Sequence, residues 1–269
     1  MLSYLYNLKP LYQALIAGTF TWFITLIGAS VVFLNKKPNR KIFDSVLGFA
    51  GGVMLAASFF SLIVPSIEYS KNLSLPLWFP VSSGILAGTL FLLLLDKIIP
   101  HLHINSKIED REGIKTEFPI YFLLVFAITL HNIPEGIAVG VSFGSLKYNK
   151  SFENFLSSLS LAIGIGIQNF PEGFAVSLPL SSSGISKSKS FILGQLSGFV
   201  EPVFAIIGAF FVTYFSKILP YALSFAAGAM IYVVIEEVIP ETQKVGNTDL
   251  ATLSFIFGFI IMTILDISI

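Results

Sequence analysis

Eight long apolar stretches constrain the fold of this chain more than any other feature of its sequence. Each has close to the roughly 20 apolar residues that a helix needs to cross a bilayer. Hydrocarbon offers the backbone no hydrogen-bonding partner, so stretches of this length must satisfy their own polar groups as helices. We therefore predict an all-α integral membrane protein, a single transmembrane domain over residues 1–269. Its eight spans are expected at about 11–34, 43–66, 79–100, 119–141, 158–180, 190–214, 220–240 and 249–268.

The composition excludes several classes of function. The chain is 54% hydrophobic and only 12% charged, whereas a soluble domain is about a quarter charged. Its net charge is zero, so no basic surface for nucleic acid is expected. The sequence contains no cysteine, which rules out disulfides and thiolate metal ligands. Any metal ion must therefore be held by nitrogen and oxygen atoms.

The distribution of Lys and Arg predicts the topology. Ten of the sixteen basic residues fall in the loops after spans one, three, five and seven, and Lys97 lies at the end of span three. The positive-inside rule therefore places these loops in the cytoplasm, including the long loop at 101–118, and both termini outside. No basic segment precedes the first apolar run, so we expect a retained helix rather than a cleaved signal peptide. The compact loops are typical of a prokaryotic multi-pass protein of the plasma (inner) membrane.

A short motif occurs twice, in two neighbouring spans. HNIPEGIAV at 131–139 is repeated as QNFPEGFAV at 168–176. The loop between spans four and five is short, so their helices should be antiparallel and the two copies should meet near the middle of the membrane. Internal repeats that meet there often form the binding sites of transporters.

The spacing within the motif predicts a site for a divalent metal ion. Each copy has an imidazole or amide four residues before a glutamate, and positions four apart share one helix face. An asparagine lies beside each pair. Imidazole nitrogen with carboxylate and amide oxygens suits zinc, iron(II) and manganese(II). The candidate ligands are His131, Asn132, Glu135, Gln168, Asn169 and Glu172.

Polar contact between helices is the alternative interpretation of these residues. Such contacts contribute about 0.6 kcal/mol each in a membrane. A buried acid costs about 2.5–3.5 kcal/mol on insertion scales, so two glutamates need more than such contacts to offset them.

The proline and glycine of each copy fit the same interpretation. Pro134 and Pro171 have no N–H to donate, so each leaves one carbonyl of the preceding turn free. A free carbonyl in hydrocarbon needs a partner such as water or an ion. Gly136 and Gly173 follow, and each should permit a neighbouring helix to approach closely.

Five glutamates fall within predicted spans, and none of these spans contains Lys or Arg. Besides the two in the motifs, they are Glu201 in span six and Glu236 and Glu237 in span seven. Acids in a membrane must be protonated, paired or bound to a cation. A cation pathway accounts for all five, although Glu236 and Glu237 lie near a helix end, from which they can also extend to water.

Three further residues are weaker candidates for the metal pathway. His101 and His103, in PHLH at the start of the long loop, can share a metal or anchor the chain at the interface. Glu68, at the outer end of span two, is either an entry ligand or an ordinary loop acid.

With these motifs in view, the sequence resembles the ZIP (Zrt-, Irt-like) metal transporters, particularly their bacterial branch. The resemblance rests on HNIPEG and QNFPEG, and extends to AGGVMLAASFFSLIVPSIE, DKIIPHLH, LSGFVEP and FAAGAMIYVVIEEVIPE. It implies an eight-helix transporter that brings divalent transition metals, most often zinc, into the cytosol. It also implies block-like, elevator-type movement of the transport helices, often within a dimer, so that a homodimer is one expected assembly.

The resemblance also implies roles for individual residues. One metal would be held by His131, Glu135, Gln168 and Glu172. A second would use Asn132, Asn169 and Glu201, with the motif glutamates shared. Glu236 and Glu237 would lie along the cytoplasmic exit, and the His101–His103 pair would form a receiving or regulatory site.

Many relatives have His in place of Gln168, and some have Asp in place of Asn169. Neutral amides weaken the site electrostatically, so the resemblance does not fix which metal is preferred.

Two other classes of function stay open on the sequence alone. An intramembrane metalloprotease would have H-E-x-x-H, whereas this motif reads H-N-x-P-E and no second histidine lies in a span. A proton-coupled carrier of another substrate could use the acids but does not need the paired spacing. We expect a transporter rather than an enzyme, without a resident cofactor, whose partners are divalent metal ions and the lipid bilayer.

Overall fold

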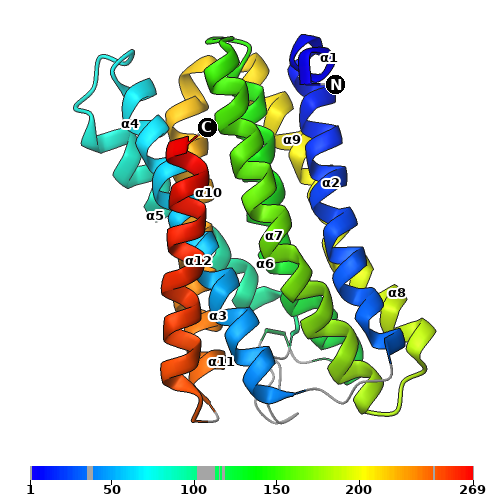
Figure 1. Ribbon diagram of the computed structural model, residues 1–269. Coiled ribbons are helices and arrows are strands. Elements are labelled where there is room, and N and C mark those ends of the chain that lie inside the picture. Colours follow the sequence, from blue (N-terminus) through cyan, green and yellow to red (C-terminus); the bar gives the residue numbers. More distant parts are fainter. Residues whose placement is uncertain are drawn as a thin grey trace.

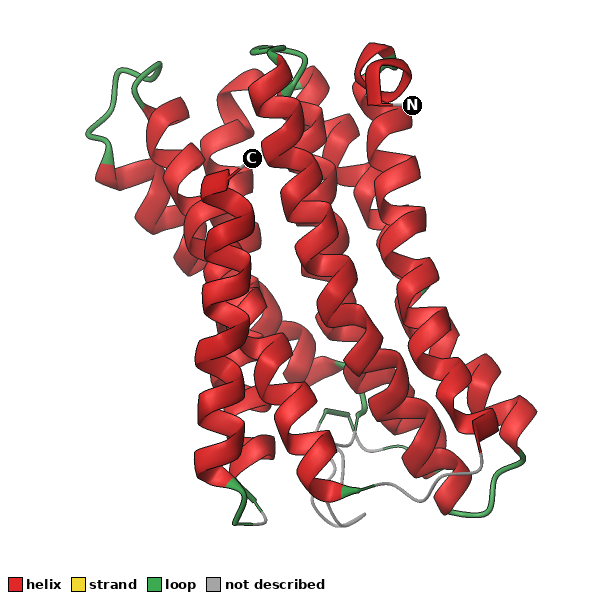
Figure 2. Ribbon diagram, viewed as in Figure 1, coloured by secondary structure: helices red, strands yellow, loops and turns green. Residues whose placement is uncertain are grey.

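The structure is a computed structural model, and it describes residues 2–34, 39–101, 113–114, 116, 119–244 and 246–268. All regular elements in these ranges are helical, which confirms the predicted all-α class (Figure 2). The elements in chain order are α1 (Leu2–Asn7), α2 (Pro10–Ser30), η1 (Val31–Leu34), α3 (Arg40–Ala57), η2 (Ser58–Ile63), α4 (Val64–Ser70), α5 (Trp78–Ile98), α6 (Ile120–Ser145), α7 (Phe152–Ser182), α8 (Lys187–Gly198), α9 (Val200–Tyr214), η4 (Ser216–Ile218), α10 (Leu219–Val233), η5 (Val234–Val238), α11 (Ile239–Gln243) and α12 (Thr248–Ser268).

Seven helical stretches in the described residues are long and apolar enough to cross a membrane. They are Pro10–Leu34, Arg40–Ser70, Trp78–Ile98, Tyr121–Ser145, Lys187–Tyr214, Ser216–Gln243 and Thr248–Ser268. Each overlaps one predicted span. The other predicted span, 158–180, lies in α7, which runs the height of the bundle beside the others (Figure 1). The number eight therefore stays a prediction.

The long helix α7 is not among these seven stretches, and it is largely enclosed by protein. It packs against α2, α3 and α8, and it buries serines such as Ser158, Ser160 and Ser177. By contrast, α12 carries large exposed apolar side chains, including Leu253 and Phe257. A helix enclosed by protein can carry polar side chains on its surface, whereas a helix that faces lipid needs an apolar surface.

Glycine contacts divide the bundle into two groups of helices. In the first, which we call the motif block (α2, α6, α7, α8 and α9), α6 packs on α9, and α2 on α7 and α9. A Cβ on Gly28 or Gly173 would strike the backbone of the facing helix, as would one on Gly136 or Gly140. These helices can be this close only because the glycines have no side chain.

The second group, which we call the frame (α3, α4, α5, α10 and α12 with η2, η5 and α11), is built in the same way. Helix α3 packs on α12, and α5 on α10. Gly52 lies against the backbone of α12, and Gly88 against that of α10. Among the described glycines, Gly164 is the one whose Cβ would reach the other group, and there it would meet the side chains of Met262 and Val53. The groups therefore touch through side chains, chiefly where α3 meets α7 and α10 meets α6.

Two frame helices widen into π-helical turns before a proline. The turn η2 precedes Pro65, and η5, which carries Glu236 and Glu237, precedes Pro240. Proline has no N–H for the helical ladder, so the preceding turn can widen into i→i+5 bonds. Such turns often occur at functional sites, because they re-aim side chains.

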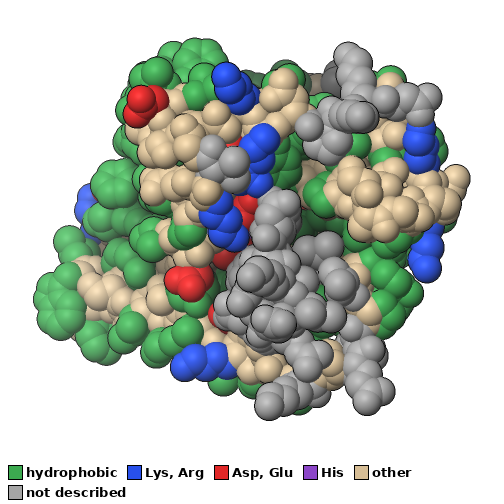
Figure 3. All heavy atoms as spheres, turned by 90° about the horizontal axis from the view of Figure 1, so that it is seen from below, with side chains coloured by type: hydrophobic (Ala, Val, Ile, Leu, Met, Phe, Trp, Pro, Cys, Tyr) green, Lys and Arg blue, Asp and Glu red, His purple; other side chains and the backbone are tan. Residues whose placement is uncertain are grey.

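Both chain termini lie at the same end of the bundle (Figure 1). Seen from the opposite end, acidic and basic side chains lie side by side near the middle of the face (Figure 3). An ion-pair network missed by the sequence analysis joins the start of α3 to α11. Arg40 contacts buried Asp44 at 2.7 Å and Glu241 at 3.0 Å, and Glu241 contacts Lys244 at 2.9 Å. Asn247 also donates to Asp44 at 2.8 Å.

Candidate metal centre

The two copies of the motif lie on α6 and α7, and both helices continue through their internal prolines, Pro134 and Pro171. The glycine after each proline allows a different neighbouring helix to approach closely. A Cβ on Gly136 would lie 2.6 Å from the carbonyl oxygen of Glu201 on α9, and one on Gly173 would strike the carbonyl of Thr25 on α2. The predicted close approaches are confirmed. They bring span six and span one, respectively, to the motif.

Hydrogen bonds join the motif residues across the helices. Gln168 Nε2 donates to Glu135 Oε1 at 2.6 Å, which links α7 to α6. Asn169 Nδ2 donates to Glu201 Oε2 at 2.7 Å, which links α7 to α9. All four side chains are fully buried. The structure thus brings residues from spans four, five and six into one buried cluster. The repeat predicted the meeting of spans four and five.

The cluster is rich in carboxyl groups. Glu135, Glu172 and Glu201 lie near enough for their carboxyl groups to interact electrostatically. Within the described part of the chain, no Lys or Arg forms an ion pair with any of the three. Buried like charges without a counter-ion are unfavourable, so this arrangement favours the entry of a cation.

Five oxygen atoms of the cluster are buried and have no hydrogen-bond partner in the described residues. Buried polar atoms in proteins almost always have a partner, so such exceptions need an explanation. Both carboxylate and amide oxygens are metal ligands. The five atoms are Asn132 Oδ1, Glu135 Oε2, Gln168 Oε1, Asn169 Oδ1 and Glu172 Oε2.

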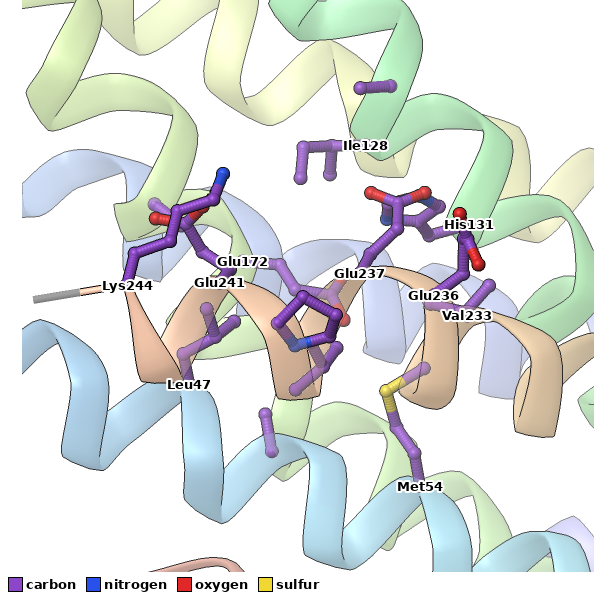
Figure 4. A pocket seen from close by; sticks show the side chains of 15 residues that line it. Leu47, Met54, Ile128, His131, Glu172, Val233, Glu236, Glu237, Glu241 and Lys244 are labelled. Carbon is purple, nitrogen blue, oxygen red and sulfur yellow. The ribbon is translucent and has the colours of Figure 1, made fainter. Parts of the chain in front are cut away.

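Histidine 131 lies at the edge of this cluster and faces the frame. Its Nε2 contacts the carboxylate of Glu237 in η5, and the close-up shows the two side chains facing each other (Figure 4). Glu237 is partly buried and Glu236 is exposed. The contact joins spans four and seven, which the sequence pattern did not predict as neighbours.

A cavity of about 170 Å³ leads away from the cluster between the motif block and the frame. Glu172 and His131 line one part, and Glu241 and Lys244 line another (Figure 4). Those last two residues belong to the ion-pair network at the end opposite the termini. The cavity therefore connects the buried cluster with that end of the bundle.

The weaker candidates lie outside the cluster. Glu68 is exposed and pairs with Lys71 at 2.6 Å; it lines a separate hollow of about 550 Å³ near Glu153. His101 is buried, with Nε2 2.9 Å from Asp96 and Nδ1 2.8 Å from the carbonyl of Ile99. His103, and most of the predicted loop 101–118, lie outside the described residues.

Histidine and carboxylate side chains alone do not complete a metal site in this arrangement. No three His, Cys, Asp or Glu residues of the described ranges are grouped closely enough to hold an ion by themselves. The cluster combines carboxylates with amides, so any coordination shell here would have to include amide oxygens, such as those of Asn132, Gln168 and Asn169.

Two threonines of α2 also reach the cluster, and sequence reasoning missed them. Thr21 and Thr25 are fully buried and contact Asn169 and Glu201. A signal was available, because the two residues are four apart in an apolar span and therefore share a face. Hydroxyls carry no charge, however, and seldom stand out in a membrane helix.

Comparison with known proteins shows the family of the chain. Residues 103–266 match the family model described as "ZIP Zinc transporter". The chain is 38% identical to "Zinc transporter ZIP11" of Homo sapiens, over 96% of this chain and 98% of that protein. It is 37% identical to "Zinc transporter GufA" of Myxococcus xanthus, over 96% and 98% of the two chains. It is also 37% identical to "Zinc transporter ZIPB" of Bordetella bronchiseptica, over 94% and 80%. On these matches, and with the paired motifs buried at the centre of a helical bundle, the chain belongs to the ZIP family of zinc transporters.

Proposed function

We propose that this protein carries zinc, or a related divalent transition metal, across a membrane through the buried cluster. The observation that carries the proposal is the set of five unpartnered buried oxygens beside three carboxyl groups. A doubly charged ion supplies what these atoms lack: positive charge and empty coordination positions. The relatives' names, each of which contains "Zinc transporter", support zinc as the substrate.

The ligand set divides into two adjacent positions, which we propose as a two-metal site. The first consists of His131, Glu135, Gln168 and Glu172. The second consists of Asn132, Asn169 and Glu201, with the motif glutamates shared between the two ions. Three carboxylates nearly balance two divalent ions, so the loaded site has far less net charge than the empty one. No thiolate is present, and ligands of this kind hold the ion less firmly than sulfur, which suits a site that must release it.

The cavity supports transport toward the cytosol. It links Glu172 and His131 with the end that lies opposite the termini, and the loops at that end carry most of the Lys and Arg. By the positive-inside rule that end is cytoplasmic, and both termini lie outside. Glu237 and Glu236 line the route, where they can take the ion from His131. We place the protein in the plasma (inner) membrane.

An elevator-like movement fits the division into two groups of helices. Within each group, glycines let backbones interlock, whereas the groups face each other through side chains. Interlocked backbones resist relative displacement more than side-chain surfaces do. The motif block holds every proposed ligand, so its movement against the frame would carry the ions with it. A homodimer, in which the frames of two copies are joined, is the proposed assembly.

Peptide cleavage within the membrane is the competing function. A zincin places a glutamate beside the first of two histidines, whereas His131 is the one histidine of the motif and contacts Glu237. A proton-coupled carrier of another substrate is the second competitor, and it would not require the unpartnered amide oxygens. Transport rather than catalysis is therefore proposed, with metal as cargo and no resident cofactor.

Uptake by purified protein in proteoliposomes tests the proposal. Radiolabelled zinc, iron(II), manganese(II) and cadmium should accumulate above the level of empty vesicles, with zinc competing against the others. The His131→Ala variant should transport zinc at least tenfold more slowly, because even residues that only support a metal ligand contribute 10–100-fold. Equal uptake by protein-containing and empty vesicles would contradict the proposed function, and parental rates in His131→Ala would remove that residue from the ligand set.

A further inference from the structure

Helix α2 lies beside the second proposed metal position without contributing a charged side chain. Its Thr21 and Thr25 are fully buried and face Asn169 of α7 and Glu201 of α9. These contacts tie the first span to residues more than 140 positions away in the sequence.

The orientation of the Asn169 amide depends on α2. Its Nδ2 donates to Glu201 Oε2 at 2.7 Å and to the carbonyl oxygen of Thr21 at 3.2 Å. An amide nitrogen has two N–H groups, so both are used. The oxygen of the same amide is then left without a partner in the described residues. The Thr21 carbonyl thus fixes which atom of Asn169 is offered to an ion.

The Thr25 hydroxyl lies between two acceptors. It is 3.4 Å from the carbonyl of Thr21, one turn earlier, and 3.5 Å from Glu201 Oε1. A threonine hydroxyl without a partner on another helix donates a short hydrogen bond within its own helix, as Thr19 does to the carbonyl of Leu15 at 2.7 Å. The Thr25 hydroxyl lies farther from its own helix, at 3.4 Å from a carbonyl that also accepts from Asn169. This hydroxyl is therefore available to the carboxylate of Glu201.

Gly198 makes this meeting of Thr25 and Glu201 possible. It is the last residue of α8, three positions before Glu201. A Cβ added there would lie 2.8 Å from Thr25 Oγ1 and 3.0 Å from Glu201 Oε1. Any residue larger than glycine would push the two side chains apart.

We propose that Thr25, together with the Thr21 carbonyl, positions Glu201 and Asn169 for the second metal ion and so sets the affinity of that site. Thr25 is a positioning residue, because it acts through Glu201 rather than touching the ion. Its hydroxyl lies 3.5 Å from one carboxylate oxygen, and the other oxygen accepts from Asn169. The inference rests on the proposed function and assigns α2 a part in it.

Three variants of α2 test the proposal in the proteoliposome assay. Thr25→Val keeps the shape of the side chain and removes the hydroxyl, whereas Thr25→Ser keeps the hydroxyl. Thr19→Val is the matched control, since Thr19 is exposed and bonds only within its helix. Thr25→Val should raise the zinc concentration for half-maximal uptake about fivefold, the size expected for the loss of one ordinary hydrogen bond. Thr25→Ser and Thr19→Val should match the parent.

A fourth variant keeps the test decisive if Thr25→Val fails to fold. Gly198→Ala separates the same two side chains by another route and should also raise the half-maximal zinc concentration. Where both variants fold, the double variant should be no worse than the stronger single one, because both remove one interaction. A parental zinc dependence in folded Thr25→Val or Gly198→Ala would overturn the inference. Absence of zinc uptake by the parent would instead overturn the proposed function.

Discussion

Replacing Glu135 with glutamine should reduce zinc uptake by about a hundredfold or more, since even residues that only support a metal ligand contribute 10–100-fold. Glu135 is fully buried, and one of its oxygens has no partner in the described residues. Glutamine has the same shape and can still accept from Gln168 Nε2, whose bond to Glu135 is 2.6 Å long. The change therefore removes charge and one anionic ligand while leaving the packing intact.

The same variant should unfold at a higher temperature than the parent when no metal is present. Three neighbouring carboxyl groups without a basic partner oppose folding, and Glu135→Gln removes one of them. Glu153→Gln is the matched control, because Glu153 is an exposed acid at the start of α7 and its loss should change neither property. Zinc uptake at the parental rate in Glu135→Gln would exclude this glutamate as a ligand.

A disulfide between the motif block and the frame should stop transport, and its reduction should restore it. A Cβ on Gly164 of α7 would lie 3.7 Å from Val53 Cγ1 of α3, which is within reach for a disulfide after small adjustments. The chain contains no cysteine, so Gly164→Cys with Val53→Cys adds the one pair available. The flexible end of Met262 must move aside, because it occupies the same space.

A second cysteine pair, placed within the motif block, is the control for effects of the oxidation itself. Ser142 on α6 and Ser158 on α7 have hydroxyl oxygens 2.9 Å apart, so the corresponding cysteines should also form a disulfide. Both helices belong to the block that we propose to move as one body, and oxidation should leave uptake unchanged. Undiminished uptake by the fully oxidised Gly164–Val53 pair would show that the two groups need not move past each other.

The elements and the central pairing could be predicted from the sequence because they depend on local patterns. Apolar length predicts the helices, and the spacing within each copy of the motif predicts which side chains share a face. The glycines after Pro134 and Pro171 correctly predicted close neighbours. The number of membrane crossings is harder to predict from composition. Helix α7 is enclosed by protein and is less apolar than the seven stretches that meet the length and composition of a membrane span.

Contacts between distant spans could not be predicted. The periodicity of a sequence shows which side chains share a face of a helix, but it does not show which other helix packs against that face. The contact of His131 with Glu237 joins spans four and seven. Arg40, which pairs with Asp44, also contacts Glu241, some 200 residues further on, in an ion-pair network that no local pattern indicates. The family resemblance predicted the membership that the comparisons confirm. The assignment of individual ligands stays a prediction.

Equilibrium zinc binding to the purified protein in lipid nanodiscs tests the central claim most directly. The claim is that the buried carboxyl and amide oxygens are held together in the membrane because divalent ions bind among them. We expect two zinc ions per chain with only nitrogen and oxygen ligands by X-ray absorption, at the distances of about 2.0–2.2 Å usual for zinc. The folded Glu135→Gln, Glu172→Gln double variant should lose both. Unchanged zinc stoichiometry and absorption spectrum in that variant would contradict the account.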